Sequence, residues 1–345
     1  MVVSTVNVLV TYPMKEVTLL DRVRAMDKTV LVSVFPYTES LEERMARRMR
    51  KFELLGPSTK VLPQQFLDFL QETEVILCMD LPTEVVSKAP KLKWVQLIGA
   101  GADFLPGTGV LESPVLLTNM AGLSSRPIAE YVLGVMTMHS KQLMKYVCQM
   151  QHRDWNRLEG SELRGKTVGI VGLGHIGSEV ASLCKAFGMT VLATKNNVGS
   201  EAPSNVDRVF RPAELKTMLG LCDFVVVSVA LTPETRELIG EAEFKAMKPS
   251  AFFVNVARGL VVDQNAMVRA LGERWIGGAA LDVSVPEPLP KESPLWELPN
   301  TLVTPHCSAI YAGNKERLID AFCENLRRYL NGQQLLNVVD KGRGY

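Results

Sequence analysis

The sequence predicts an α/β protein built from two Rossmann-like domains, each a doubly wound parallel sheet. At 345 residues the chain exceeds the size that a single hydrophobic core fills, so two domains of roughly 150 residues are expected. Short β-rich runs alternate with helical stretches along most of the chain, which is typical of parallel sheets covered by helices on both faces. The composition, 47% hydrophobic and 22% charged, is that of an ordinary globular protein.

Charge and cysteine content narrow the expected partners. Lys and Arg total 38 against 37 Asp and Glu, so no positive field suited to nucleic acid or an anionic membrane is expected. Residues 1–10 lack a secretory signal pattern, and no apolar run approaches the roughly 20 residues that span a bilayer. The six cysteines have no CxxC spacing. We therefore expect a cytoplasmic protein with a small-molecule partner and no bound metal.

The first third of the chain predicts one parallel sheet. Its five predicted strands are 6–10, 30–34, 75–78, 94–98 and 115–118. A charged segment over 41–52 is predicted to be helical, and a long helix is predicted over 127–155, where Pro127 suits the first turn. This long helix marks the predicted crossing between the domains.

The second block predicts a complete dinucleotide-binding domain. Its six predicted strands are 167–171, 190–193, 224–229, 251–256, 278–282 and 301–304. Six strands with intervening helices are what such a domain needs. A helix is then predicted over 314–330, and the apolar tail 335–339 is predicted to pack back on the first domain.

A glycine-rich turn follows the first strand of the second block. It places G-x-G-x-x-G at Gly172, Gly174 and Gly177, at the start of a helical stretch. Gly172 permits the tight turn, Gly174 lets the backbone approach a pyrophosphate, and Gly177 lets helix and strand pack closely. The helix N-terminus offers unpaired N–H groups to the phosphates. This context favours a dinucleotide site over a turn that merely needs glycine.

The choice of cofactor depends on the end of the next strand, about 20 residues on, where NAD sites carry Asp or Glu. Lys195 stands there instead, followed by Asn196. A cation would accommodate the 2′-phosphate of NADP, which a carboxylate repels. NADP is therefore favoured, and the alternative is a solvated lysine in an enzyme that uses NAD.

Three polar residues at the ends of later strands predict the reaction. Arg258, Glu287 and His306 lie at or just past the carboxyl ends of predicted parallel strands, where ligands bind in such sheets. Arginine would anchor a carboxylate with a planar fork, and histidine would supply a proton near neutral pH. Glu287 would orient the ring of His306 and favour its protonated form. Taken singly, each has a structural alternative: a surface turn residue, a loop carboxylate and a core histidine.

Together these motifs resemble the D-isomer-specific 2-hydroxyacid dehydrogenase family. The likeness rests on Gly-Leu-Gly-His-Ile-Gly, Asn-Val-Ala-Arg-Gly, Leu-Asp-Val followed by Pro-Glu-Pro, and Thr-Pro-His, in that order. The resemblance implies a discontinuous flavodoxin-like substrate-binding domain, 1–120 plus 310–345, and a Rossmann dinucleotide-binding domain, 121–309. It also implies a catalytic cleft between the two domains, and a homodimer.

The resemblance further assigns residues to roles. Arg258, Glu287 and His306 match the family's catalytic residues, and Asp282 is expected to hold the nicotinamide carboxamide. Backbone N–H groups at Ala100 and Gly101, in the loop 99–103, would bind the substrate carboxylate opposite Arg258, and His306 would contact the substrate as its proton donor. The expected cofactor contacts are Gly172, Gly174, His175, Ile176, Gly177, Lys195, Asn196, Val229, Ala230, Thr235, Val256, Ala257, Arg258, Asp282 and His306.

The expected activity is hydride transfer between NAD(P)H and a small 2-keto acid, giving a D-2-hydroxy acid, as in glyoxylate or hydroxypyruvate reductases. One alternative is a short-form D-3-phosphoglycerate dehydrogenase, which oxidation of 3-phosphoglycerate would reveal. Another is a cofactor-sensing scaffold that resembles the C-terminal-binding corepressors, in which catalysis is secondary. Cofactor binding without turnover of any 2-keto acid would favour the scaffold.

Overall fold

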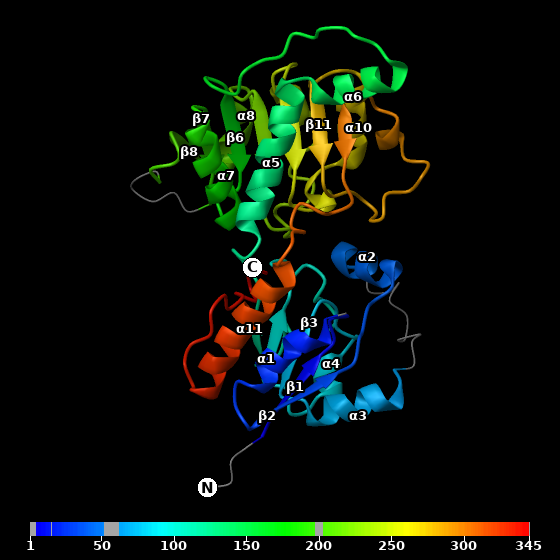
Figure 1. Ribbon diagram of the computed structural model, residues 1–345, viewed down its shortest axis with the longest axis vertical. Coiled ribbons are helices and arrows are strands. Elements are labelled where there is room, and N and C mark those ends of the chain that lie inside the picture. The colour runs from blue at the N-terminus through cyan, green and yellow to red at the C-terminus, as the bar shows by residue number, and fades with distance from the viewer. Residues whose placement is uncertain (1–4, 15, 52–61, 197–202, 345) are drawn as a thin grey trace. The chain divides into compact units, whose positions relative to one another are not determined.

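The computed structural model describes residues 5–14, 16–51, 62–196 and 203–344 (Figure 1). The chain forms two compact units: unit 1 comprises Met1–Leu123 with Ala312–Tyr345, and unit 2 comprises Ser124–Tyr311. The sequence predicts the corresponding boundaries after residues 120 and 309. The role of each unit stays a prediction at this point.

Unit 1 contains a five-stranded parallel sheet in the order β2-β1-β3-β4-β5. Its strands are β1 Val6–Val10, β2 Val30–Val34, β3 Val75–Cys78, β4 Trp94–Leu97 and β5 Leu116–Thr118. The helices described in this unit are η1 Val17–Leu19, α1 Leu20–Arg24, α2 Leu41–Met49, α3 Gln64–Glu72, α4 Val85–Lys88 and α11 Asn314–Leu330. Helices α3 and α4 pack on one face of the sheet and α1 and α11 on the other, so the central strands are apolar on both sides.

The C-terminal part of the chain completes unit 1, as the sequence predicts. Helix α11 stacks Phe322 on Trp94 of β4, with ring centroids 5.5 Å apart. The tail then pairs with β5, since Val338 forms an antiparallel bridge with Thr118. Lys341 follows it and donates hydrogen bonds from Nζ to the carbonyls of Val110, Ser113 and Val115. The predicted packing of the tail on the first domain is therefore confirmed.

Unit 2 contains a seven-stranded parallel sheet in the order β12-β11-β10-β9-β6-β7-β8. Its strands are β6 Thr167–Val171, β7 Thr190–Thr194, β8 Arg208–Phe210, β9 Phe224–Val227, β10 Phe252–Asn255, β11 Gly278–Leu281 and β12 Thr301–Val303. The helices described are α5 Ser125–Ser140, α6 Leu143–His152, α7 His175–Ala186, η3 Pro212–Glu214, α8 Leu215–Leu219, α9 Glu241–Ala246, η4 Gly259–Val261, α10 Gln264–Gly272 and η5 Pro294–Trp296. Helices α5 and α7 cover one face, and α8, α9 and α10 cover the other.

The prediction of six strands in this block is wrong, because β8 was missed. It is a three-residue edge strand that begins with a charged residue, so it carries almost no alternating pattern. Several predicted strands also run one or two residues past the observed carboxyl ends. Most of these residues still donate a backbone hydrogen bond to the neighbouring strand, as Val256 does to Val227 and Asp282 does to Asn255. They begin the loops that carry the candidate site.

The predicted long helix over 127–155 is also wrong, since two helices replace it. Helix α5 ends at Ser140 and α6 begins at Leu143, after Gln142 adopts a left-handed φ of 57°. The carbonyl of Ser140 accepts a hydrogen bond from the N–H of Ser161 at 2.8 Å. Ser161, in a segment distant along the chain, therefore takes the acceptor that a continuing helix would need, which no local pattern reveals.

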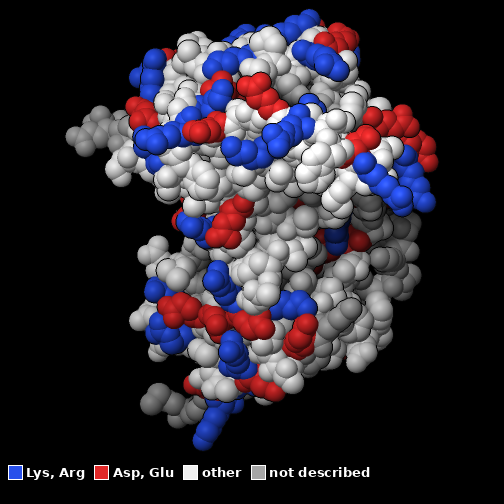
Figure 2. Space-filling model, turned by 45° about the horizontal axis from the view of Figure 1, so that its top comes forward, with Lys and Arg blue, Asp and Glu red and all other residues white. Residues whose placement is uncertain are grey.

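Charged side chains of both signs are mixed on the surface. On the face shown in Figure 2, basic and acidic residues lie next to one another over much of the area, in keeping with a net charge of +1. Among the described residues, none of the helices is both long and apolar enough to cross a membrane.

Candidate active site

The glycine turn has the geometry that its spacing predicts. Gly172 adopts a φ of 100°, and a Cβ on it would stand 2.6 Å from Cγ1 of Val229. A Cβ on Gly177 would overlap the carbonyl oxygen of Gly172, so only glycine lets α7 approach β6 this closely. At Gly174, by contrast, nothing lies within 4 Å of the Cβ position. The turn is thus closely packed against the protein at Gly172 and Gly177, and it is open at Gly174, where a ligand would approach.

This turn lies at the point where the strand order of unit 2 reverses. Strand β6 has β7 on one side and β9 on the other. Open α/β sheets bind ligands outside the carboxyl ends of their strands at such a reversal point. Val229 follows β9 and flanks Gly172. Thr235 closes the same loop through a hydrogen bond from its Oγ1 to the carbonyl of Ala230, at 2.6 Å. The predicted cofactor residues Val229, Ala230 and Thr235 therefore lie in the loop after β9, which flanks the glycine turn at Val229.

The predicted 2′-phosphate residues follow β7 directly, and both are exposed. The N–H of Lys195 bonds to the carbonyl of Phe210, which continues the pairing of β7 with β8 by one residue. This register places Arg211, also exposed, beside Lys195 at the same sheet edge. Nothing in the sequence marks Arg211, because β8 is too short to be predicted as a strand. Two cations therefore stand where the adenosine ribose is expected.

His306 and Glu287 form a hydrogen-bonded pair. Nδ1 of His306 lies 3.1 Å from Oε2 of Glu287, and the two side chains are 41% and 22% exposed. His306 also has a left-handed φ of 51°, a strained conformation for a residue with a side chain. Because Nδ1 is engaged by the carboxylate, Nε2 is the ring atom left to face a substrate. The predicted contact between the two residues is confirmed.

Arg258 lies on the neighbouring loop of the same sheet. Strands β10, β11 and β12 are adjacent, and Arg258, Glu287 and His306 follow their respective carboxyl ends. Asn255 accepts from the N–H of Ala257 and donates to the carbonyl of Arg258, which holds the loop 255–258 in shape. A Cβ on Gly259 would overlap the carbonyl oxygen of Ser284, so this loop closely approaches the one that carries Glu287.

Asp282 anchors the segment that carries His306. Its carboxylate is buried, and Oδ1 accepts from Oγ1 of Thr304 at 2.6 Å and from the N–H of Cys307 at 2.8 Å. Oδ2 accepts from the N–H of Ser308 at 3.0 Å. The side chain therefore spans both sides of His306 and organises its loop. Its expected contact with a nicotinamide carboxamide stays a prediction.

A tyrosine from α5 extends this network. The hydroxyl of Tyr131 lies 2.8 Å from Oγ1 of Thr304. Burial raises the pKa of Tyr131 to about 12, so the phenol stays neutral around neutral pH. Nothing in the sequence of a predicted helix marks Tyr131 as a residue that contacts a loop 173 residues away. It joins Thr304 and Asp282 as a support of the His306 segment.

The predicted carboxylate-binding loop lies in unit 1, directly after β4. Ala100 is exposed and Gly101 half-buried. The loop 99–103 follows the carboxyl end of a parallel strand, the position at which open α/β sheets bind ligands. Ala100 and Gly101 thus belong to one unit, and the other predicted site residues belong to unit 2.

Comparison with known proteins agrees with this arrangement. The family model described as D-isomer specific 2-hydroxyacid dehydrogenase, NAD binding domain, matches residues 133–308, just over half of the chain. A glyoxylate reductase of Thermococcus gammatolerans is 32% identical over 319 residues, which cover 88% of this chain and 95% of that protein. The chain belongs to the D-isomer specific 2-hydroxyacid dehydrogenase family. It is accordingly an oxidoreductase that uses a nicotinamide cofactor.

Another relative of this D-2-hydroxyacid dehydrogenase is longer than the chain and is named for a substrate other than glyoxylate. A D-3-phosphoglycerate dehydrogenase of Methanocaldococcus jannaschii is 30% identical over 308 residues. The match covers 88% of this chain but only 58% of that relative, so the chain spans little more than half of its length.

Solved structures share the fold over nearly the whole chain. The dehydrogenase of Xanthobacter autotrophicus in complex with NADPH and MES has a TM-score of 0.79 and 27% identity, with 99% of this chain and 100% of that chain covered. The NADPH-dependent glyoxylate/hydroxypyruvate reductase of Sinorhizobium meliloti, in complex with NADP and sulfate, has a TM-score of 0.80 and 25% identity over the same shares. The predicted fold of two Rossmann-like domains is confirmed.

The residues of unit 2 fit a nicotinamide dinucleotide. The open space at Gly174 leaves room for a pyrophosphate at the N-terminus of α7, where backbone N–H groups point outward. Strand β10 lies next to β9 in the sheet, and Val256 and Ala257 follow its carboxyl end. Among the described residues, no group of three His, Cys, Asp or Glu is arranged to hold a metal ion.

Proposed function

We propose that the protein reduces a small 2-keto acid of the glyoxylate or hydroxypyruvate type to its D-2-hydroxy acid, with NADPH preferred over NADH. The observation that carries this proposal is the His306–Glu287 pair, in which Nδ1 of the histidine lies 3.1 Å from Oε2 of the glutamate. Asp282 anchors the segment that carries His306, and this segment follows a strand of the same sheet as the glycine turn. A histidine oriented by a carboxylate at Nδ1 is a proton donor at Nε2. Reduction of a carbonyl to an alcohol requires such a donor.

Each part of the site supplies one requirement of the reaction. The bound cofactor supplies the hydride, which goes to the keto carbon. His306 donates the proton that the carbonyl oxygen takes up, and Glu287 holds the ring in place. Arg258 binds the substrate carboxylate through its planar guanidinium, together with the N–H groups of Ala100 and Gly101. Unit 1 is then the substrate-binding domain and unit 2 the dinucleotide-binding domain.

The substrate proposal is tested with a panel of 2-keto acids. Glyoxylate, hydroxypyruvate, pyruvate and a longer apolar 2-keto acid are each offered with NADPH and with NADH, and oxidation of the cofactor is followed at 340 nm. We expect the largest kcat/KM with glyoxylate or hydroxypyruvate. Absence of turnover across the panel, with cofactor binding intact, contradicts the proposal.

A second substrate is supported by a specific relative. The match to the D-3-phosphoglycerate dehydrogenase of Methanocaldococcus jannaschii covers 88% of this chain. Oxidation of 3-phosphoglycerate with NAD or NADP is therefore measured beside the panel. The D-2-hydroxy acids that correspond to the panel are oxidised under the same conditions. If the kcat/KM for 3-phosphoglycerate exceeds that for each of them, phosphoglycerate replaces glyoxylate as the proposed substrate.

The preference for NADPH is supported by the two exposed cations after β7 and β8, Lys195 and Arg211. A 2′-phosphate would lie between them, whereas the ribose hydroxyls of NADH give them no charge to bind. We expect Lys195→Gln to raise the Kd of NADPH on the order of tenfold and to leave that of NADH within about twofold. The two constants are measured by cofactor fluorescence, with Lys216→Gln, an exposed lysine on α8, as the control. An equal change for both cofactors contradicts the assignment.

We further propose that the protein is a homodimer in which α6 lies at the interface. This helix buries none of its own residues, and its exposed apolar side chains include Leu143, Val147 and Met150, spaced as one stripe. Trp155, just after it, is 93% exposed. A ten-residue helix gains little stability unless its apolar face is covered. A second copy of the chain would cover it.

A further inference from the structure

The segment after β5 orients the N–H groups of the loop 99–103. The carbonyl of Gly99 accepts a hydrogen bond from the N–H of Met120 at 3.0 Å, and that of Ala100 accepts from Nδ2 of Asn119 at 2.8 Å. In a trans peptide the carbonyl and the following N–H point in opposite directions. The N–H groups of Ala100 and Gly101 therefore point away from this segment. Among the described residues, neither has a hydrogen-bond acceptor.

Helix α2 holds the other end of the same loop through its arginines. Its N-terminus is defined by a capping box between Ser40 and Glu43. Three arginines at i, i+3 and i+4 share one face of the helix, and each pairs with an acid from a loop after a different strand. The pairs are Arg44 with Asp80, Arg47 with Glu39, and Arg48 with Asp103.

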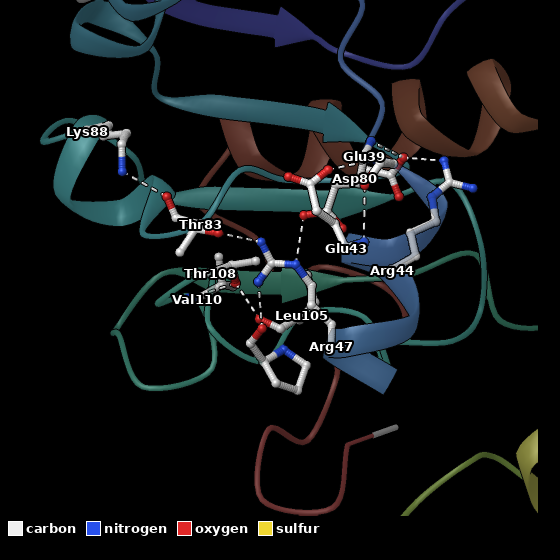
Figure 3. A network of polar contacts seen from close by, with 12 residues as sticks. Glu39, Glu43, Arg44, Arg47, Asp80, Thr83, Lys88, Leu105, Thr108 and Val110 are labelled. Carbon is white, nitrogen blue, oxygen red and sulfur yellow. Dashed lines mark hydrogen bonds and ion pairs between the residues drawn. The ribbon is translucent and has the colours of Figure 1, made fainter. Parts of the chain in front are cut away.

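Arg47 is the buried centre of this arrangement (Figure 3). It donates from Nε to Oε1 of Glu39 at 2.7 Å, from Nη2 to Oγ1 of Thr83 at 2.9 Å, and from Nη1 to the carbonyl of Pro106 at 2.7 Å. Both charged side chains of the Glu39–Arg47 pair are 1% exposed. A buried ion pair adds little net stability over an apolar contact, but the three directional hydrogen bonds of Arg47 are all made at this position of the helix. This pair thus sets where α2 lies over the strand ends.

Arg48 connects α2 to the predicted carboxylate-binding loop itself. Its Nε lies 3.0 Å from Oδ2 of Asp103, whose side chain is 5% exposed. The loop is thereby tethered at Asp103 and, three residues on, at Pro106, while Asn119 holds its beginning. With glycine at 99 and 101, an untethered loop would sample many conformations.

We propose that α2 acts as an arginine clamp that holds the loop 99–103 in its carboxylate-binding conformation, with Arg48 as the positioning residue. The inference rests on the proposed function, because it takes the N–H groups of Ala100 and Gly101 as the binding site of the substrate carboxylate. Two backbone N–H groups bind an anion tightly when both already point at its position in the unbound protein, because no ordering cost then remains. The clamp provides this preorganisation from residues that do not touch the substrate.

The test replaces Arg48 by methionine, which keeps the length of the side chain and removes its charge. We expect the KM of the best 2-keto acid and the inhibition constant of oxamate, an unreactive carboxylate analogue, to rise on the order of 10- to 100-fold. The kcat at saturation stays within about threefold, and the Kd of NADPH is unchanged, because the loop binds substrate and not cofactor. Arg22→Met, which breaks the exposed pair with Asp320 in the same unit, is the control and should change none of these.

Two results would overturn the inference: an unchanged KM and oxamate constant in a folded Arg48→Met protein, or an equal loss in Arg22→Met. Thermal midpoints are recorded for all variants. If Arg48→Met folds poorly, Asp103→Asn repeats the test with a smaller change of shape. A wild-type protein that reduces no 2-keto acid contradicts the proposed function separately. Oxamate binding to the complex with NADPH then still measures the loop, and failure of Arg48→Met to weaken it rejects the clamp.

Discussion

At the scale of single residues, the site depends on how His306 is held. Its left-handed backbone would be unfavourable without compensation, and the compensation comes from Asp282, which accepts hydrogen bonds on both sides of it. Thr304 connects this carboxylate to Tyr131. The ring is then oriented from the other direction by Glu287. Asp282 thus holds the backbone on both sides of His306, and Glu287 orients its imidazole ring.

The role of His306 as proton donor gives the sharpest prediction at this scale. His306→Ala should lower kcat by about 10²- to 10⁴-fold while the Kd of NADPH stays within about twofold. Glu287→Gln should cause a smaller loss, because an amide still accepts a hydrogen bond but carries no charge. Stopped-flow reduction and cofactor fluorescence measure both quantities. Glu292→Gln, an exposed glutamate on the same loop, serves as the control. A His306→Ala enzyme of near wild-type rate would refute the assignment.

At the scale of elements, the candidate site is formed by the loops that follow the strands and not by the strands themselves. The predicted strands that were too long ended in Ile98, Val229, Val256, Asp282 and Thr304, and each begins or joins a loop of the site. Most of these side chains are apolar or small, and the N–H groups of Ile98, Val256 and Thr304 still donate to the neighbouring strand. The sequence therefore does not distinguish these first loop residues from strand residues. In unit 1, the loops after β2, β3 and β4 are held by the arginines of α2. The sequence predicts α2 only as a charged helix.

Helix α2 also gives a prediction for pH dependence. Burial raises the pKa of Glu39 to about 7, and the attraction of Arg47 offsets only part of this. The folded state then favours the protonated acid more than the unfolded state does, whose carboxyl titrates near 4.5. Its contribution to stability is complete below pH 4.5 and is lost as the pH rises through 7.

Glu39→Gln should remove this contribution. The fall in the urea midpoint of unit 1 between pH 5 and pH 7.5, followed by hydrogen exchange at β3 and β4, should be smaller in the variant than in wild type. Glu42→Gln changes an exposed glutamate of the same helix and should leave the wild-type slope intact. Equal slopes in Glu39→Gln and wild type would contradict the role of Glu39.

At the scale of the whole molecule, the proposed homodimer explains the exposure of α6. A charge on its apolar stripe should oppose association, because a carboxylate loses its hydration when it is buried. We expect a dimer mass for the wild type and a monomer mass for Val147→Glu in light scattering at micromolar concentration. Leu221→Glu changes an equally exposed apolar residue elsewhere in unit 2 and should remain dimeric. A monomeric wild type would reject the dimer, and a dimeric Val147→Glu would place the interface elsewhere.

The sequence by itself determined most of the strands and the identity of the chemical groups. Two parallel sheets, the turn at Gly172 to Gly177, and the placement of Arg258, Glu287 and His306 after adjacent strands follow from patterns within a few residues. Such patterns are readable because side-chain alternation and glycine requirements are local properties. The pairing of His306 with Glu287 was also predictable, since both follow neighbouring strands of one sheet.

Only the tertiary structure decided what holds these groups in place. The break between α5 and α6 depends on Ser161, the register that brings Arg211 beside Lys195 depends on β8, and the support of His306 depends on Tyr131. The arginine clamp likewise joins α2 to loops after three different strands. Each is a contact between segments distant in the chain, so it leaves no periodicity in the sequence and is specified by packing alone.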